Sequence, residues 1–363
     1  RHARDGFELR EATMLFSIFN LLGYRDRDTS IASLYDNAID AVKHAEKAGF
    51  EIAWFAEHHF SNYSACPSPL MMCARLAGET TRIKLAPGVV VIPLYHPVRL
   101  MSEIGMVSAM SHGRLVLGIG SGYQPYEFDR FDEDLADSTE KLIEFMEMME
   151  LAFDNETFSF DGKHFKIPET HITTRPSAGM PDVWVAGDNP MLSSFAARKG
   201  YASMVTPRHV TPALLKAARS TIEDRYREAG VDPSRLRLGV LRHVCVTDDR
   251  NEALDFLDHV RHQIRVSQAL RRREELLDGS MIIERPYENE PSLEEMAEYM
   301  LVGSAETIAE RIVAEAREAG TDQMLLQFQA GSTDHATTLR SIERFATDVQ
   351  PLVEKALAKE AAA

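Results

Sequence analysis

The sequence of 363 residues has little cysteine and no long apolar run. Its three cysteines, Cys66, Cys73 and Cys245, are too few and too irregularly spaced for a disulfide framework or a CxxC-type metal site. This scarcity favours a reducing, cytoplasmic setting. No stretch approaches the roughly 20 apolar residues that span a bilayer, and the residues after Arg1 lack the apolar segment and cleavage site of a signal peptide. We therefore expect a soluble protein.

Basic charge is also scarce, because 40 Lys and Arg face 56 Asp and Glu, for a formal net charge of -16. Binding to nucleic acid or to an anionic membrane needs clustered basic residues, so neither partner is expected. The densest basic run, Arg271 to Arg273, is followed at once by Glu274 and Glu275. This run is typical of a solvated helix face.

What the chain does contain is a regular alternation of short apolar runs with amphipathic stretches of helical period. Hydrophobic residues make up 44% and charged residues 26% of the chain, as in ordinary globular proteins. Strands are predicted at residues 14–19, 52–55, 84–92, 115–119, 183–185, 202–205, 238–246 and 324–328. Helices are predicted at residues 30–48, 69–79, 97–110, 138–153, 191–199, 211–229, 252–270 and 304–319.

Eight such strands with helices between them predict an α/β protein, a (β/α)8 TIM barrel with insertions, formed by a single domain over residues 1–363. Ser304 is a good helix N-cap, and Gly200 and Gly320 stand where a helix ends in a left-handed residue. Residues 154–182 predict a hairpin insertion with Asp161-Gly162 at its turn. Residues 275–292 have no period and predict a mobile loop over the active site.

In such a barrel the active site lies at the carboxyl ends of the strands, and the second predicted strand is followed by Glu57, His58, His59 and Phe60. Two histidines behind a carboxylate indicate proton transfer or metal binding. Because neighbouring residues of an extended strand point to opposite faces, we expect only one histidine to face the reaction centre. A purely structural pair stays an alternative at this point.

The third predicted strand contains Gly88 and Val89, and glycine within a strand often marks close approach of the backbone to a ligand. Pro97 suits the first turn of the helix that follows, and His96 before it is interpreted as a structural cap.

Two further strand ends carry features suited to a phosphate. Residues 118–123 form a glycine- and serine-rich turn that lacks the third glycine of GxGxxG, so it is a weak Rossmann signal but can present amides to an anion. After the fifth predicted strand, Gly187, Asp188 and Asn189 precede a helix with Ser193 in its first turn, where backbone amides favour an anion. Asp188 would repel a phosphate unless it caps the helix, and a plain helix cap is the alternative interpretation of this segment.

Taken together, these motifs resemble in order and spacing the bacterial luciferase-like flavin-dependent monooxygenases. The likeness covers residues 14–205 well and continues more loosely to about residue 352. It is carried by Glu57-His58-His59-Phe60, by Pro93-Leu94-Tyr95-His96-Pro97-Val98-Arg99, and by Ser111-His112-Gly113-Arg114 leading into Leu117-Gly118-Ile119-Gly120-Ser121-Gly122.

The resemblance implies a two-component TIM-barrel enzyme that uses FMN in its reduced form, FMNH2, supplied by a separate flavin reductase. Reduced flavin and O2 would give a C4a-(hydro)peroxyflavin, which transfers one oxygen atom to a small organic substrate. His58 matches the family's catalytic histidine, expected to manage protons there. Gly88 and Val89 match a non-prolyl cis peptide against the flavin ring. The residues that match the FMN phosphate region are Ser121, Gly122, Tyr123, Gly187, Asp188, Asn189 and Ser193.

The chain departs from the light-emitting members at two positions. Gly120 stands where they carry a reactive cysteine, and Ser121 where they carry a phosphate-binding arginine, so light emission is not expected. Lys141 and Arg198 are the candidates for neutralising the phosphate instead. Aromatic residues that suggest an apolar ligand, and that core packing explains equally well, are Tyr63, Tyr95, Tyr123 and Phe128.

Three alternatives remain beside a monooxygenase. Relatives of this fold use the deazaflavin F420 for hydride transfer, which requires no O2. A metal-dependent hydrolase using Glu57, His58 and His59 is disfavoured because no HxH pair follows the first strand, and no metal is predicted. A non-catalytic flavin-binding subunit is disfavoured by the presence of His58. The expected partners are a small molecule, O2, a reductase and a second copy of the chain, in a homodimer or larger homo-oligomer.

Overall fold

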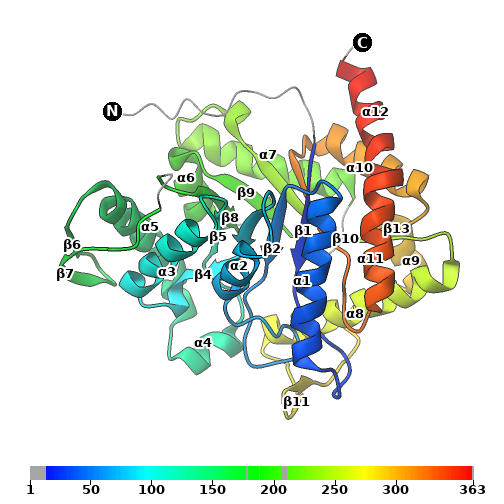
Figure 1. Ribbon diagram of the computed structural model, residues 1–363, viewed down its shortest axis with the longest axis horizontal. Coiled ribbons are helices and arrows are strands. Elements are labelled where there is room, and N and C mark those ends of the chain that lie inside the picture. Colours follow the sequence, from blue (N-terminus) through cyan, green and yellow to red (C-terminus); the bar gives the residue numbers. More distant parts are fainter. Residues whose placement is uncertain (1–13, 177–178, 188, 207–210, 362–363) are drawn as a thin grey trace.

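The computed structural model describes residues 14–176, 179–187, 189–206 and 211–361. In this part of the chain a parallel sheet closes into a barrel surrounded by helices (Figure 1). The barrel strands are β1 (Leu15–Asn20), β2 (Ile52–Phe55), β3 (Lys84–Pro87), β4 (Val90–Val91), β5 (Val116–Gly120), β8 (Asp182–Ala186), β9 (Ala202–Val205), β10 (Leu238–Val246) and β14 (Gln323–Gln327). Because β3 and β4 share one position of the ring, the predicted (β/α)8 barrel is confirmed.

Each barrel strand pairs in parallel with the strands next to it in the sequence, and β14 returns to pair with β1. The ring closes between the third and fourth positions, where Val90 pairs with Ile119 and Leu85 forms an isolated bridge with Leu115. All strands are parallel, so their carboxyl ends open at one end of the barrel.

Side chains alternate along the strands between two hydrophobic clusters, as the period of two in a strand requires. Trp54, Trp184 and Leu325 belong to the cluster inside the barrel. Leu117 and Val185 belong to the larger cluster between the barrel and its helices. The inner cluster fills the barrel below its mouth, so the carboxyl end is where a ligand can bind.

Helices follow the strands and cover the outside of the ring (Figure 1). Ser304 accepts a hydrogen bond from the Thr307 amide at 3.3 Å, and Gly200 and Gly320 have φ of 71° and 54°, so the predicted caps are confirmed. No helix in the described ranges is long and apolar enough to cross a membrane. The helices that follow successive strands are α1 (Ile31–Lys47), α2 (Pro69–Ala77), α3 (Pro97–Met110), α5 (Ser138–Asp154), α6 (Pro190–Lys199), α7 (Pro212–Glu228) and α10 (Ala305–Ala319).

The end of the chain differs from the sequence-based prediction, which places two helices between the last two strands and none after them. The eighth strand is followed by α11 (His335–Arg344), a short π-helical stretch and α12 (Gln350–Ala361). Ile342, Phe345 and Val349 are buried at helical spacing, and α11 packs on α1. Many charged residues interrupt this apolar stripe in the sequence, which hides it.

The additional helix α8 (Arg250–Arg272) is not part of the ring. It is followed by α9 (Leu293–Tyr299) and by β13 (Leu301–Gly303), which pairs with β10. Figure 1 shows α8 at the same end of the barrel as β11 (Leu277–Asp278) and α4 (Pro125–Phe131), and α4 packs against α8. These elements cover the carboxyl end of the strands.

Residues 158–170 form an antiparallel hairpin of β6 (Phe158–Asp161) and β7 (Lys166–Thr170), with the predicted Asp161-Gly162 turn between them. Glu144 of α5 holds the turn, because its carboxylate accepts hydrogen bonds from the amides of Lys163, His164 and Phe165. The hairpin is therefore fixed to the outside of the barrel through α5.

Within residues 275–292, β11 pairs with β12 (Met281–Ile282) to form a two-stranded hairpin at the mouth. Asn62, in the loop after β2, donates its backbone amide to Ser280 O at 3.0 Å, and its side chain accepts from the Ile282 amide at 2.9 Å. The mobility of this segment stays a prediction.

One ion pair is buried in the wall of the barrel. Arg242 of β10 and Glu315 of α10 are bonded side chain to side chain, and their side chains are only 1% and 3% exposed. Arg242 also donates to Tyr299 O at 2.6 Å. Burial raises the pKa of Glu315 and lowers that of Arg242, and the opposite charge of the partner opposes each shift without cancelling it.

Candidate active site

His58 lies in the loop after β2 and is oriented by Glu127 of α4. Its Nδ1 is 3.0 Å from Glu127 Oε1, and its side chain is 12% exposed while that of Glu127 is 1% exposed. The same oxygen accepts a hydrogen bond from the His59 amide at 2.7 Å. Because an ionised carboxylate can only accept, this pairing places a proton on Nδ1 and leaves Nε2 to exchange protons.

His59 points to a different carboxylate. Its Nε2 is 3.0 Å from Glu57 Oε1, and Glu57 Oε2 accepts from the Val91 amide at 3.0 Å. Burial raises the pKa of Glu57, and its hydrogen bond to His59 opposes that shift. The His58 and His59 side chains therefore contact different acids. Both histidines lie in the loop after β2, so the shape of this loop, and not alternation along a strand, turns them apart.

Two tyrosines surround the His58 ring. The Tyr63 and Tyr123 rings lie 4.7 Å and 5.6 Å from it, centroid to centroid, and their hydroxyls are 3.3 Å apart. Burial raises the pKa of Tyr63 well above its usual value, so its phenol is neutral at physiological pH. The other two aromatic candidates lie elsewhere: Tyr95 hydrogen-bonds to Glu57, and Phe128 is buried.

The peptide bond between Gly88 and Val89 is cis, as the resemblance implies. A Cβ at Gly118 would lie 2.2 Å from Pro87 O, and one at Gly120 would lie 2.6 Å from Val89 Cγ2. Close packing of β5 against the β3–β4 junction therefore explains both glycines. The position of the light-emitting members' cysteine admits no side chain here unless Val89 moves.

The two segments predicted to bind the phosphate follow neighbouring strands. Gly120, the last residue of β5, pairs with Ala186, the last residue of β8. Ser121, Gly122 and Tyr123 are partly exposed just beyond Gly120. Gly187, with φ of 131°, follows Ala186. The two strand-end segments thus leave the barrel side by side.

At the start of α6, Asn189 Oδ1 accepts from the Met191 and Leu192 amides at 2.9 and 3.4 Å, so Asn189 is the helix cap. Ser193 is buried in the first turn. Asp188 lies outside the described residues. A cap with no ligand accounts for the Asn189 side chain, while its exposed backbone remains open to an anion.

Neither predicted phosphate partner is well placed. Lys141 forms an ion pair with Glu133. Arg198 lies in the last turn of α6, at the end opposite its anion-binding terminus. Arg271 of α8 instead stacks on Tyr123, with its guanidinium carbon 4.6 Å from the ring centroid. His96 is the N-cap residue of α3 but makes no side-chain cap hydrogen bond.

Sequence reasoning missed Glu127 and the cover that α8 provides. On α8, Val266 and Leu270 join the inner cluster, and the Ser267 side chain hydrogen-bonds to Tyr63. The spacing of these residues and Arg271 is helical and places them on one face. The polar Ser267 and the exposed Arg271 beside the buried Val266 and Leu270 hide this apolar stripe in the sequence. No local pattern links Glu127 to His58 across 69 residues.

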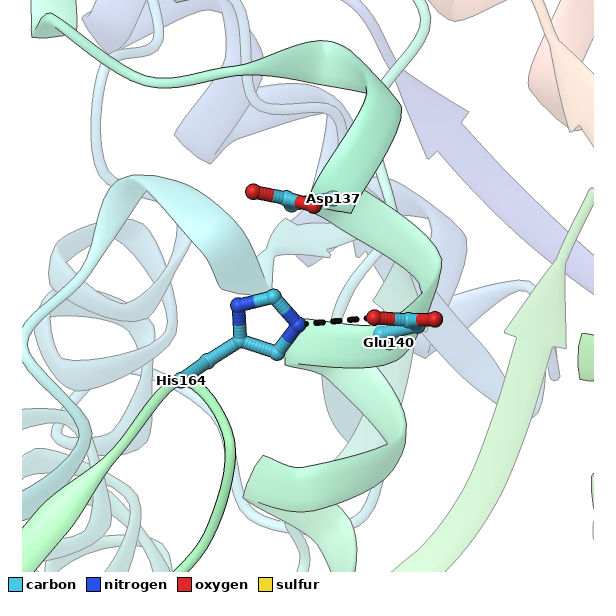
Figure 2. A group of neighbouring side chains, drawn as sticks. All are labelled: Asp137, Glu140 and His164. Atoms are coloured by element: carbon cyan, nitrogen blue, oxygen red, sulfur yellow. Dashed lines mark hydrogen bonds and ion pairs between the residues drawn. The ribbon is translucent and has the colours of Figure 1, made fainter.

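Asp137, directly before α5, lies together with Glu140 of α5 and His164 of the outer hairpin (Figure 2). His164 Nε2 is 2.9 Å from Glu140, and Lys163 forms an ion pair with the same carboxylate at 2.5 Å. An ammonium group thus already neutralises this carboxylate, and the cluster helps to hold the hairpin on α5.

Comparison with known proteins identifies relatives along the whole chain. The family described as luciferase-like monooxygenase matches residues 14–323. An uncharacterized protein of Sinorhizobium fredii, y4vJ, is 36% identical over 96% of this chain and 100% of its own length. The oxygenase component of the flavin-dependent trigonelline monooxygenase of Acinetobacter baylyi is 29% identical over 66% of this chain and 67% of its own.

Solved structures share the fold. Monooxygenase RslO1 of Streptomyces bottropensis has a TM-score of 0.80 at 22% identity, covering 93% of this chain and 99% of its own. The FMN complex of the oxygenating constituent of 3,6-diketocamphane monooxygenase, from a Pseudomonas putida plasmid, has a TM-score of 0.75 at 21% identity, with coverage of 94% and 99%. An F420-dependent secondary alcohol dehydrogenase has 0.73 at 19%, with coverage of 94% and 99%. The match over residues 14–323 establishes that the chain is an enzyme of the luciferase-like monooxygenase family.

Proposed function

We propose that this flavin-dependent monooxygenase binds reduced FMN from a separate reductase and transfers one oxygen atom of O2 to a small organic substrate. The observation that carries the proposal is the His58–Glu127 pair, a histidine with one nitrogen held by a buried carboxylate and the other left for proton transfer. The FMN complex of a structural neighbour and the oxygenase component among the relatives support the flavin and the two-component arrangement.

The residues at the mouth fit FMN. Val89, Ala186 and Leu241 pack against the inner cluster but keep part of their surface exposed, so this end of the barrel is not filled by side chains. Ser121 to Tyr123 and the segment before α6 would offer backbone amides to the phosphate. Reduced FMN would supply the electrons that activate O2.

The chain's own side chains then have separate tasks. Glu127 orients His58, and His58 Nε2 would hold or release a proton beside the reacting oxygen. Tyr63 and Tyr123 limit the freedom of the imidazole. The cover formed by α8 would exclude water during the reaction. A homodimer or larger homo-oligomer and a cytoplasmic location stay predictions, and light scattering of the purified protein tests the first.

The decisive experiment is anaerobic titration of the protein with reduced FMN, followed by rapid mixing with oxygenated buffer. We expect stoichiometric binding and a return of oxidised-FMN absorbance that is delayed relative to reduced FMN alone. Oxygen-independent hydride transfer with F420, together with no binding of reduced FMN, would overturn the proposal in favour of the deazaflavin alternative that one structural neighbour represents.

Arg271 is the basic residue that we assign to the FMN phosphate. Arg271→Gln is expected to raise the Kd for FMN about tenfold or more, because a charge-assisted contact would be lost, and to leave the Kd for riboflavin nearly unchanged. Flavin fluorescence titration measures both constants. Arg272→Gln, at the exposed neighbouring position, is the matched control. Equal weakening of FMN and riboflavin would instead assign Arg271 to the support of Tyr123.

A further inference from the structure

Three polar side chains form a connected group on the inner wall near the mouth: His243 of β10, Gln327 of β14 and Gln263 of α8. Gln263 Nε2 is 3.2 Å from His243 Nε2, and Gln327 Nε2 is 2.9 Å from Gln263 Oε1. Strands β10 and β14 bring two of them together directly, because His243 pairs with Gln327 in the sheet register. Nothing in the proposed handling of protons by His58 uses this group.

A backbone carbonyl sets the direction of every hydrogen bond in the group. Gln327 Nε2 donates to Gln329 O at 2.8 Å, and a carbonyl oxygen can only accept. The Gln327 amide orientation is therefore fixed, so Gln263 turns its oxygen to Gln327 Nε2 and its nitrogen to His243. His243 Nε2 must then accept, and the proton of the neutral ring is on Nδ1.

The surroundings keep that ring neutral. Burial, followed by the charge of neighbouring Arg242, lowers the pKa of His243 to about 4. At neutral pH the His243 ring is therefore uncharged, and it can donate one hydrogen bond, from Nδ1–H. Among the described residues the hydrogen bond of the His243 ring is made by Nε2, and Nδ1 is not among the buried atoms that lack a partner. His243 also keeps part of its surface exposed, which leaves Nδ1–H for a ligand.

Contacts through α8 connect this group to the surroundings of His58. A small cavity is lined by both Gln263 and Tyr63, and Tyr63 contacts the His58 ring. Helix α8 spans the two groups, since Gln263 contacts His243 and Ser267, one turn further on, contacts Tyr63. Both groups therefore border the carboxyl end of the barrel, where a substrate beside His58 would bind.

We infer that His243 is a substrate-binding residue, which donates a hydrogen bond from Nδ1 to an uncharged oxygen acceptor of the substrate, such as a ketone or amide carbonyl. This inference rests on the proposed function, which places the substrate at the mouth of the barrel, and it adds the chemical class of that substrate.

The cations near the group are already paired, which disfavours an anionic substrate at this position. Arg242 is paired with Glu315, and Arg265 with Glu284 and Glu290. Leu325 belongs to the inner cluster close by. A carboxylate placed against neutral His243 would lose its hydration without gaining a cation, whereas a carbonyl needs only the one donor.

The test measures binding of three probes of similar shape to the oxidised-FMN complex of the protein: cyclohexanone, methylenecyclohexane and cyclohexanecarboxylate. Saturation-transfer NMR gives the affinities, and no turnover is required. Cyclohexanone is expected to bind about three- to tenfold more tightly than methylenecyclohexane, the size of one neutral hydrogen bond, and the carboxylate most weakly.

His243→Leu is expected to abolish the preference for the ketone, and His243→Asn to retain it, because the asparagine amide can place a donor near Nδ1. Unchanged FMN affinity reports that both variants are folded. A ketone preference that survives in His243→Leu, tightest binding of the carboxylate, or no preference in the parent protein would each overturn the inference. Because no reduced flavin or O2 takes part, loss of the preference in His243→Leu would support the inference even if oxygenation failed.

Discussion

His58→Ala is expected to lower oxygen transfer to the substrate by about 10²- to 10⁴-fold, the range that a positioned acid–base group contributes. The variant loses the imidazole that Glu127 holds at 3.0 Å, so no side chain remains to exchange the proton at that point. The measurement is product formed per reduced FMN in a single turnover, with O2 consumed and hydrogen peroxide released recorded in parallel. The affinity for FMN should change little, because the contacts of the His58 imidazole are to Glu127, Tyr63 and Tyr123 of the protein itself.

Glu127→Gln tests the other member of the His58–Glu127 pair. It keeps the size of the side chain but removes the charge that favours a proton on Nδ1, so we expect a loss of oxygen transfer between those of the parent protein and His58→Ala. His44→Ala, on the exposed side of α1, is the control for loss of a histidine. If His58→Ala transferred oxygen within threefold of the parent protein, His58 would have no catalytic role.

The second large effect concerns stability. Glu315→Ala is expected to lower the free energy of unfolding by about 3–5 kcal/mol, because Arg242 would remain buried without its counter-charge. Chemical denaturation followed by far-UV circular dichroism measures the shift. The loss arises in the wall between β10 and α10, away from His58, so flavin binding by the protein that remains folded should persist.

Two further variants test the cause of that loss. The double variant Arg242→Met with Glu315→Leu should recover most of the stability, since an apolar pair of similar volume needs no desolvation of charge. Lys216→Ala removes an exposed pair with Glu318 and should cost no more than about 1 kcal/mol. A loss below 1 kcal/mol in Glu315→Ala would show that the buried pair adds little to the fold.

The barrel could be predicted because short apolar runs mark its strands and apolar residues at helical spacing mark the helices between them. The eight strand positions follow from short apolar runs, and parallel pairing follows from the helices between them. The final helices escaped prediction for a physical reason: Ile342, Phe345 and Val349 form a narrow stripe among charged residues, and the partner on which it packs, α1, lies near the other end of the sequence.

The candidate site was predictable only where chemistry is local. The sequence places Glu57, His58 and His59 at a strand end, and the expectation that only one histidine faces the reaction centre needed no distant partner. In the structure, however, a loop turns the two side chains apart. Glu127, Gln263 and His243 contact their partners across strands and helices distant in sequence, and glutamine or glutamate on a helix is ordinarily a solvated residue. These polar residues come into contact with their partners only when the barrel is closed and α4 and α8 cover its carboxyl end.

The two bonds of Asn62 connect the β11–β12 hairpin to the loop that carries His58. Its backbone amide and its side chain hold Ser280 and Ile282, and it lies only a few residues after His58 on the same loop. If the β11–β12 hairpin moves, as the sequence predicts, both bonds would break, while other bonds of the loop, such as that from the Ala65 amide to Leu22 O, would remain. Return of the hairpin would then add two hydrogen bonds to the loop that carries His58, so closing the mouth and stiffening the surroundings of the imidazole would be one event.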